Sequence, residues 1–305
     1  DFYRFAKFGG WKTDLSSQQQ RNFYAVKVYH SLEKSMSFLD NKPDSGWVNA
    51  ALLIDIIESA ITNKNIGYHD IHAYDVLAKF IELNYERSNN ALSKKVKCRF
   101  NALIIPGNIN LNLNNGVVQL ASEDIEKGKM TNPYDFFYTR YSIRQFSENR
   151  LSKDTIHEAI KLSLKTPSAC NRQPWHVYHL DNKHAIDKAL SLQTGNRGFS
   201  HTIQDLLIVC ADLRAFNPGS ERYQHWIDGG MFAMSIVYSL HSLGAGSCCL
   251  NWSHQGKIDK QLRRVIPGIS NSHTIIMMLA VGNVRNKNQL CVSPRRSLDE
   301  IITEI

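Results

Sequence analysis

Three observations predict an α+β fold for this chain, with helices segregated around a small sheet. Apolar residues recur at helical spacing through residues 1–90, helix and strand patterns alternate in the second half, and no repeat of roughly 20 to 50 residues is visible. The 305 residues include 43% hydrophobic and 21% charged residues. This composition is typical of a globular protein and excludes wholesale disorder, collagen and small disulfide scaffolds.

Three helices joined by short loops are predicted in residues 1–90. Turn-forming residues at 41–46 and 62–68 separate three apolar stripes. The stripes consist of Val28, Leu32, Met36 and Leu39, then Trp47, Ala51, Ile54, Ile57 and Ile61, and then Ile71, Tyr74, Leu77, Ile81 and Tyr85.

Residues 98–130 differ in character and predict a small β-hairpin followed by a polar linker. Ile109, Leu111 and Leu113 alternate with asparagines, residues 114–116 read Asn-Asn-Gly, and residues 117–120 are again apolar. The linker ends near Pro133. We therefore expect two domains, a helical extension with this hairpin over residues 1–130 and a second domain over residues 134–305.

The second half alternates helices and strands. Ser152 supplies an N-cap for a helix with Ile156, Ala159, Ile160 and Leu164 facing inward. The predicted strands are residues 176–180, 206–211, 247–251 and 274–281. Residues 230–243 are apolar nearly all round, which predicts a helix buried in a core or an interface.

Two polar motifs flank the Ser152 helix. Before it, Arg140-Tyr141-Ser142-Ile143-Arg144-Gln145-Phe146 places two arginines four residues apart, which can offer forked donors to an anion or to the polar edge of a heterocycle. After it, residues 165–175 hold Ser, Asn and Gln between prolines, so amide groups can meet one edge of a planar ring. The alternatives are an exposed basic turn for the first motif and a polar helix stop for the second.

Two further motifs lie near the C-terminus. Residues 243–252 contain Gly244 and Gly246, which let backbone approach a flat ligand closely, but they lack the G-x-G-x-x-G spacing of a dinucleotide fold. Residues 292–297 place Arg295 and Arg296 directly after a proline. This pair can clamp a phosphate, and a solvated basic tail is the alternative.

The order and spacing of these motifs resemble the nitroreductase family of FMN-dependent NAD(P)H oxidoreductases. The resemblance covers residues 134–305, and Asp228-Gly229-Gly230 adds to it. It implies an α/β/α sandwich with a mainly antiparallel central sheet, assembled as a homodimer with FMN at the subunit interface. Residues 29–34, Tyr-His-Ser-Leu-Glu-Lys, resemble an N-terminal helical extension found on family members associated with polysaccharide gene clusters.

The resemblance implies a role for each motif residue. Arg140 and one or both of Arg295 and Arg296 would hold the FMN phosphate, while Tyr141 and Ser142 would contact the ribityl chain. Arg144 would lie near the pyrimidine edge, where a positive charge raises the flavin reduction potential.

The remaining site residues come from two more segments. Pro167, Ser168, Ala169 and Asn171 would reach the flavin from the second subunit. Cys249, Leu250 and Asn251 would cover a ring face or edge, with a backbone N–H directed at the flavin N5. Asn196 and Arg197 are further candidates for polar contacts. The chain departs from many family members at Asn251, where those carry an acidic residue.

The activity implied is hydride transfer from NADH or NADPH through FMN to a small, flat, electron-poor aromatic acceptor such as a nitroaromatic or a quinone. No catalytic side chain is expected, because the flavin carries the chemistry. No metal site is expected either, since none of the 12 histidines falls in a ligand pattern. His225, His241 and His254 are interpreted as packing or surface residues.

Two alternatives from other classes stay open. One is a flavin-binding or scaffold protein of the same fold that catalyses no turnover. In that case the extension would be an interaction surface, and the protein would be tied to polysaccharide biosynthesis. The other is a nucleic-acid binder, which rests only on the net charge of +8 and lacks any aromatic and basic binding motif. We therefore expect no nucleic-acid partner.

The apolar runs are far shorter than the roughly 18 residues of a transmembrane helix, so no membrane association is expected. The six cysteines show no C-x-x-C spacing, and free thiols in a reducing cytoplasm are predicted. The chain begins with Asp, which leaves open whether a segment precedes it.

Overall fold

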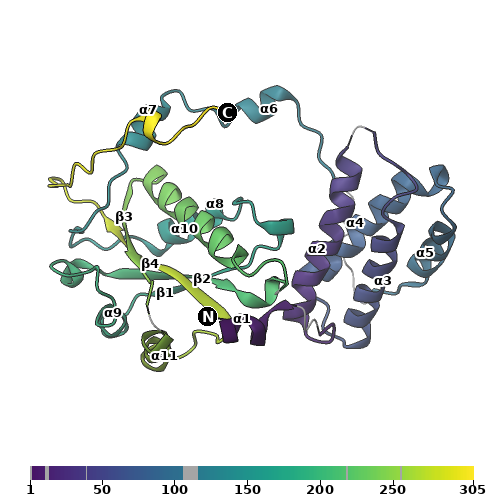
Figure 1. The fold of residues 1–305 in the computed structure, drawn as a ribbon, viewed down its shortest axis with the longest axis horizontal. Helices are drawn as coiled ribbons and strands as arrows, with labels where there is room; N and C mark the ends of the chain where they lie inside the picture. Colours follow the sequence, from purple (N-terminus) through teal and green to yellow (C-terminus); the bar gives the residue numbers. More distant parts are fainter. Residues whose placement is uncertain (1, 11–13, 39, 106–115, 218, 255) are drawn as a thin grey trace.

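The computed structural model describes residues 2–10, 14–38, 40–105, 116–217, 219–254 and 256–305. It consists of a helical bundle and a sheet flanked by helices, joined along one side by α2 and at the top by a long connection through α6 and α7 (Figure 1). The helices are α1 (Phe2–Phe8), α2 (Gln18–Ser37), α3 (Trp47–Thr62), α4 (Tyr68–Asn84), α5 (Ala91–Ala102), α6 (Ser122–Glu126), α7 (Pro133–Tyr138), α8 (Lys153–Ser163), α9 (Lys183–Leu190), α10 (Gln224–Ser242) and α11 (Gly256–Val265).

The helical bundle confirms the three predicted helices, which are α2, α3 and α4. Their apolar stripes meet in one core that includes Leu32, Trp47 and Leu77. The sequence reasoning missed α5, which also packs on this core and begins at Asn90, whose side chain accepts a hydrogen bond from the backbone of Leu92.

The predicted hairpin is wrong in the part that can be compared. Residues 106–115, which hold most of its first strand and the start of its turn, lie outside the described residues. Residues 117–120 form no strand, and α6 follows them. Val118 and Leu120 face solvent, so their apolar side chains add nothing to a core that would stabilise a strand there.

All four predicted strands are confirmed. They are β1 (Trp175–Leu180), β2 (Asp205–Asp212), β3 (Ala245–Asn251) and β4 (His273–Asn283), and they form one antiparallel sheet in the order β1-β2-β4-β3. Strands β2 and β4 lie in the centre and are almost fully buried, which explains their nearly continuous apolar sequences.

Helices cover both faces of this sheet. Helices α8 and α10 pack on the face that carries Leu207 and Val209, and α9 and α11 pack on the face of Leu206 and Ile208. The sequence reasoning missed α9 and α11. The α+β sandwich is confirmed. Helix α1 packs through Phe5 on residues that follow β2, so the chain's first helix contacts the sheet body rather than the bundle.

Helix α10 is longer than predicted and is not buried all round. One side, which includes Phe232, Ile236 and Leu240, packs on the sheet. On the other side, Ile227 is 52% exposed and Met231 is 37% exposed. Part of the apolar surface that the sequence assigned to a core or an interface is therefore uncovered in the single chain.

Candidate functional site

The Arg140 motif lies as an extra edge beside β3. Ser142 forms a parallel bridge with Ser247, and the backbone N–H of Ile143 donates to the Ser247 carbonyl at 2.9 Å. Gly246 makes this approach possible, because a Cβ there would lie 2.9 Å from the Ile143 side chain. The glycine motif and the arginine motif are thus two halves of one packed edge.

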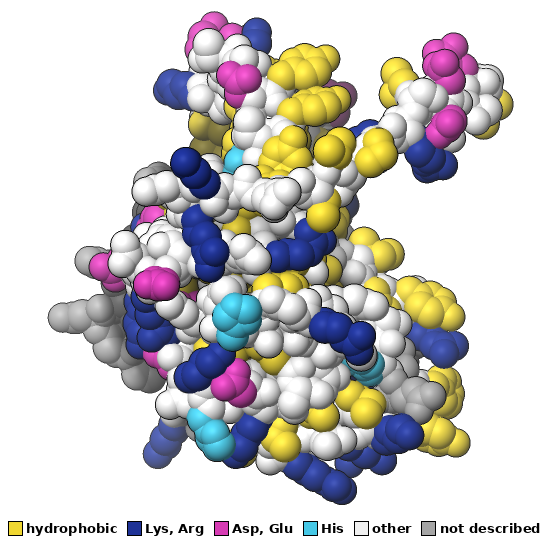
Figure 2. Space-filling model, turned by 90° about the vertical axis from the view of Figure 1, so that its left-hand side faces the viewer, with side chains coloured by type: hydrophobic (Ala, Val, Ile, Leu, Met, Phe, Trp, Pro, Cys, Tyr) yellow, Lys and Arg dark blue, Asp and Glu magenta, His cyan; other side chains and the backbone are white. Residues whose placement is uncertain are grey.

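A cleft of about 380 Å³ opens between this edge and the segment that follows β4. Its lining includes the side chains of Arg144, Arg285 and Lys287, and no acidic residue among the described residues lines it. Arg285 is held in place because its Nε donates to the Phe146 carbonyl at 2.8 Å. The face of the molecule in Figure 2 displays more Lys and Arg than Asp and Glu side chains. The cleft is a cationic site suited to an anion such as a phosphate.

The end of β3 borders this region with backbone groups that face away from β4. Since the Ser247 carbonyl points outward to Ile143, the alternation of an antiparallel strand points Cys249 and Asn251 outward too. The Asn251 carbonyl indeed accepts a hydrogen bond from Gln193 Nε2 at 2.8 Å. Cys249 is exposed while Leu250 is buried in the core. A ligand edge can therefore meet the backbone of Cys249, and Leu250 supports the strand from below.

The two cysteines at this edge stay protonated at neutral pH. Burial raises the pKa of Cys248 and of Cys249, and the nearby charges of Arg144 and Arg140 oppose this only in part. They present neutral sulfur surface rather than nucleophilic thiolates.

The segment of Pro167, Ser168, Ala169 and Asn171 lies elsewhere. It precedes β1, at the opposite edge of the sheet from β3, and touches α2 and α10 instead. The single chain therefore divides the predicted site residues into two groups that do not meet. Within one group are Arg140, Tyr141, Ser142, Arg144, Cys249, Leu250 and Asn251.

Arg295 and Arg296 lie in neither group. Both lie in the exposed C-terminal tail. Arg295 donates to the carbonyl of Ser293, two residues away. Besides Arg144, the cations that line the cleft are Arg285 and Lys287, which the sequence reasoning missed. Their signal was two basic residues within four positions of the end of the last strand.

Asn196 serves the fold rather than an open site. It is buried, and its side chain donates to the carbonyls of Leu190 at 2.8 Å and Gln193 at 2.7 Å. Arg197 is exposed. The residue of this loop that reaches β3 is Gln193, which the sequence reasoning did not select.

The histidines form no metal site within the described residues. His225 is buried against the Phe5 ring, and His241 bonds the carbonyl of Phe136 at 2.9 Å. In the bundle, Glu33 of the Tyr29–Lys34 motif lies 3.0 Å from His30 and 3.4 Å from His72. The contact between Glu33 and His72 connects α2 to α4.

Comparison with known proteins shows that residues 138–195 match the sequence pattern that defines the nitroreductase family. A protein of Archaeoglobus fulgidus, named as an NADH dehydrogenase or NAD(P)H nitroreductase, is 27% identical over 148 residues, which is 48% of this chain and 81% of that protein. Residues 138–195 therefore carry the sequence pattern of the nitroreductase family. An NAD(P)H nitroreductase of Bacillus subtilis is 29% identical over 36% of this chain and 55% of its own length, so the match spans about half of that relative.

Solved structures of nitroreductases resemble the same part of the chain at low identity. A nitroreductase from Desulfovibrio desulfuricans, solved in complex with FMN, is 19% identical with a TM-score of 0.47, covering 58% of this chain and 98% of that one. An NADH dehydrogenase or NAD(P)H nitroreductase from Parabacteroides distasonis has a TM-score of 0.49 at 16% identity, covering 56% of this chain and 95% of that one.

The residues of the cleft and of the β3 edge fit a flavin nucleotide. The cleft offers Arg144, Arg285 and Lys287 to a phosphate-bearing ligand, and the outward backbone of Cys249 can donate to a ring nitrogen. Gly246 and Gly282 leave no room for a side chain, so the arginine motif packs close on the sheet edge. An oxidoreductase of this family is the general function to which these groups correspond.

Proposed function

We propose that this protein is a nitroreductase-like, FMN-dependent oxidoreductase that moves a hydride from NADH or NADPH to a flat, electron-poor acceptor such as a nitroaromatic or a quinone. The observation that carries the proposal is the cationic cleft beside the outward edge of β3, where Arg144 and Arg285 lie without an acidic neighbour in the described lining. The family match covers part of this edge.

Bound FMN would supply the hydride acceptor and donor of this reaction. The chain's own groups bind and orient it. Arg140, Arg144, Arg285 and Lys287 attract and hold anionic groups, with Arg295 or Arg296 added by the tail. Ser142 offers a hydroxyl to the ribityl chain, and the Cys249 N–H is a fixed donor for the ring edge. Leu250 and its neighbours keep water from the inner side of the edge.

We further propose a homodimer in which each site uses both chains. Pro167–Asn171 lies at the far edge of the sheet from Cys249, so a second copy would have to bring Ser168 and Asn171 to this flavin. The uncovered apolar side of α10 supports the same assembly, with Ile227 52% exposed and Met231 37% exposed.

Apolar side chains on the connection and the tail support the dimer as well. They are half or more exposed in the single chain. The set includes Tyr134, Tyr138, Val292, Leu298, Ile301 and Ile302. A partner subunit would remove much of this surface from water.

We propose that the protein works in the reducing cytoplasm. Its six free cysteines support this location. No helix in the part of the chain that the structure describes has both the length and the apolar character to cross a membrane.

The proposal is tested by purifying the chain with added FMN and recording its visible spectrum, then adding NADH or NADPH anaerobically. We expect a yellow protein with about one FMN per chain, bleaching of the flavin band by a reduced nicotinamide, and return of the band with a quinone. A colourless protein that takes up no FMN would overturn the proposal. FMN that binds but is reduced by neither nicotinamide would instead favour the flavin-binding protein without turnover.

A further inference from the structure

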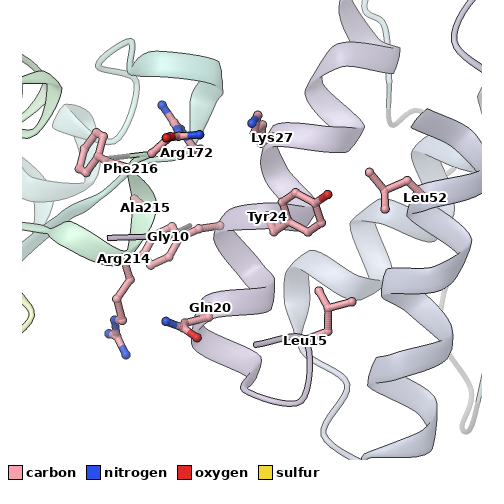
Figure 3. Close-up of a pocket in the computed structure, with 12 residues that line it drawn as sticks. Gly10, Leu15, Gln20, Tyr24, Lys27, Leu52, Arg172, Arg214, Ala215 and Phe216 are labelled. Carbon is pink, nitrogen blue, oxygen red and sulfur yellow. The ribbon is translucent and has the colours of Figure 1, made fainter. Parts of the chain in front are cut away.

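The N-terminal extension meets the sheet body at a pocket of about 410 Å³ beside α2 (Figure 3). Its walls carry three cations, Lys27 from α2 and Arg172 and Arg214 from the sheet body. Each arginine forms an ion pair with a carboxylate: Arg172 pairs with Glu221, and Arg214 pairs with Asp212.

Arg172 connects this pocket to the loop that ends at Asn171. The residue is only 4% exposed. Its Nε donates to the Ala169 carbonyl at 2.9 Å, and its two terminal nitrogens donate to the carboxylate of Glu221 at 2.7 and 2.8 Å. Glu221 is fixed in turn by the backbone N–H of Asn217 at 2.7 Å. A planar fork of this kind sets both the position and the direction of the loop backbone.

The loop that Arg172 holds has a backbone that needs such support. Cys170, Asn171 and Gln173 have φ angles of 51°, 53° and 50°, in the left-handed region that side chains disfavour. Conformations of this kind persist when surrounding contacts determine them. On the other side of the loop, the Ala169 N–H donates to Asp228 at 3.2 Å.

Helix α2 covers the same loop. It contacts the short turn Ala169–Asn171. Burial alone would raise the pKa of Glu221, but the hydrogen bonds from Arg172 and from the Asn217 backbone, with the charges of Arg172 and of Lys27 on α2, lower it overall. The extension therefore covers one side of the loop, where the Arg172 side chain is only 3% exposed and that of Glu221 23% exposed.

We propose that Arg172, held by Glu221 beneath α2, is a positioning residue that fixes Pro167–Asn171 in the conformation that meets the flavin. This inference rests on the proposed function, in which the loop reaches the flavin of a second subunit. The inference also assigns a function to the extension: by covering the Arg172–Glu221 pair, α2 stabilises the loop that reaches the flavin.

The test compares Arg172→Lys with the matched variant Arg214→Lys. Arg214 lines the same pocket, pairs with Asp212 and reaches Gln19 of α2, but none of its described hydrogen bonds goes to the loop. FMN affinity is measured by quenching of flavin fluorescence, and the reduction potential of bound FMN by dye equilibration. Melting temperatures of both variants report general damage.

We expect Arg172→Lys to weaken FMN binding at least tenfold and to shift the potential or visible spectrum of bound FMN. Arg214→Lys should keep the wild-type affinity within about twofold, even where it lowers the melting temperature as much. Equal affinities and spectra for wild type and Arg172→Lys would overturn the inference, as would an equal loss in both variants.

Glu221→Gln covers the case in which Arg172→Lys does not fold. It keeps a hydrogen-bond acceptor and removes the charge, so we expect a smaller loss of FMN affinity in the same direction, and an unchanged affinity would overturn the inference. Wild-type protein that binds no FMN contradicts the proposed function itself, and the inference falls with it. Wild-type protein that binds FMN while Arg172→Lys binds it equally well contradicts only the inference.

Discussion

Arg144 is the residue through which the cleft acts most directly on a flavin. Its side chain is exposed and lines the cleft. The described hydrogen bond of its side chain, from Nη1 to the Cys291 sulfur at 3.5 Å, is long, and an anionic group can replace it. We expect Arg144→Ala to reduce FMN retention or to lower the flavin potential, because the positive charge near the ring is lost. Equilibrium dialysis and redox titration measure the two effects.

Arg264→Ala serves as the control for Arg144. It removes an exposed arginine from the last turn of α11 and leaves the cleft intact. If both variants retain FMN with the wild-type potential, the placement of Arg144 is wrong. If both lose FMN to the same degree, the effect comes from net charge rather than from the site.

His225 makes the stability of the protein depend on pH. Burial lowers its pKa to about 4, and its ring stacks on Phe5 at a centroid distance of 5.4 Å. The unfolded chain binds this proton below roughly pH 6.5, so the folded state is fully favoured above that value and loses stability as the pH falls toward 4. At pH 5 the loss from this residue is about 2 kcal/mol.

Replacement of His225 by Phe should remove that part of the pH dependence. Urea unfolding at pH 7.5 and pH 5 is compared for wild type, His225→Phe and His184→Gln, the last an exposed histidine on α9. We expect a smaller difference between the two pH values in His225→Phe alone. The same pH dependence in all three proteins would show that His225 is already protonated or that its charge costs nothing.

At the scale of elements, the contact between β3 and the arginine motif depends on one missing side chain. A Cβ at residue 246 would lie 2.9 to 3.2 Å from atoms of Ile143, which is itself buried. We expect Gly246→Ala to push the motif away from β3, to cost about 1–3 kcal/mol of stability and to weaken FMN binding several-fold. Chemical denaturation and FMN titration measure the two effects.

The matched change is Gly256→Ala at the start of α11, where a Cβ would meet no atom within 4 Å. It should leave FMN affinity unchanged and raise stability slightly, because alanine favours a helix over glycine. A Gly246→Ala protein with wild-type stability and FMN affinity would mean that the edge can shift without consequence.

At the scale of the whole molecule, the exposed side of α10 is the test of the proposed dimer. Met231→Lys places a charge where Met231 and Ile227 are exposed in the single chain. We expect it to convert a dimer into monomers and to lose FMN along with the interface, because each flavin site would need both chains. Sedimentation velocity and FMN stoichiometry report both changes.

Val48→Lys is the control for Met231. Val48 is 73% exposed on α3 of the bundle, far along the chain from α10. It should leave the dimer and its flavin unchanged. If the Met231→Lys protein stays dimeric with bound FMN, α10 does not form the interface. If the wild-type protein is a monomer with bound FMN, the proposed dimer is wrong.

The sequence by itself determined the main elements of the sheet body. The strands at Leu206 and Thr274 were predicted because a strand buried on both faces must be apolar throughout, and Ser152 marked its helix because an N-cap is a local property. The amphipathic helices α9 and α11 were missed, although each buries one apolar side on the sheet. The order of motifs also led to the family without any coordinates.

The full set of residues that line the cleft became visible with the fold. The tertiary structure placed Arg285 and Lys287 in the cleft with Arg144 and separated Asn171 from Cys249 by the width of the sheet, because strand order follows from long-range pairing that leaves no mark in local sequence. It also turned Arg172 from an unremarked loop residue into the link between the extension and the flavin loop. Such a role depends on burial and on a distant partner, Glu221, which spacing along the chain cannot indicate.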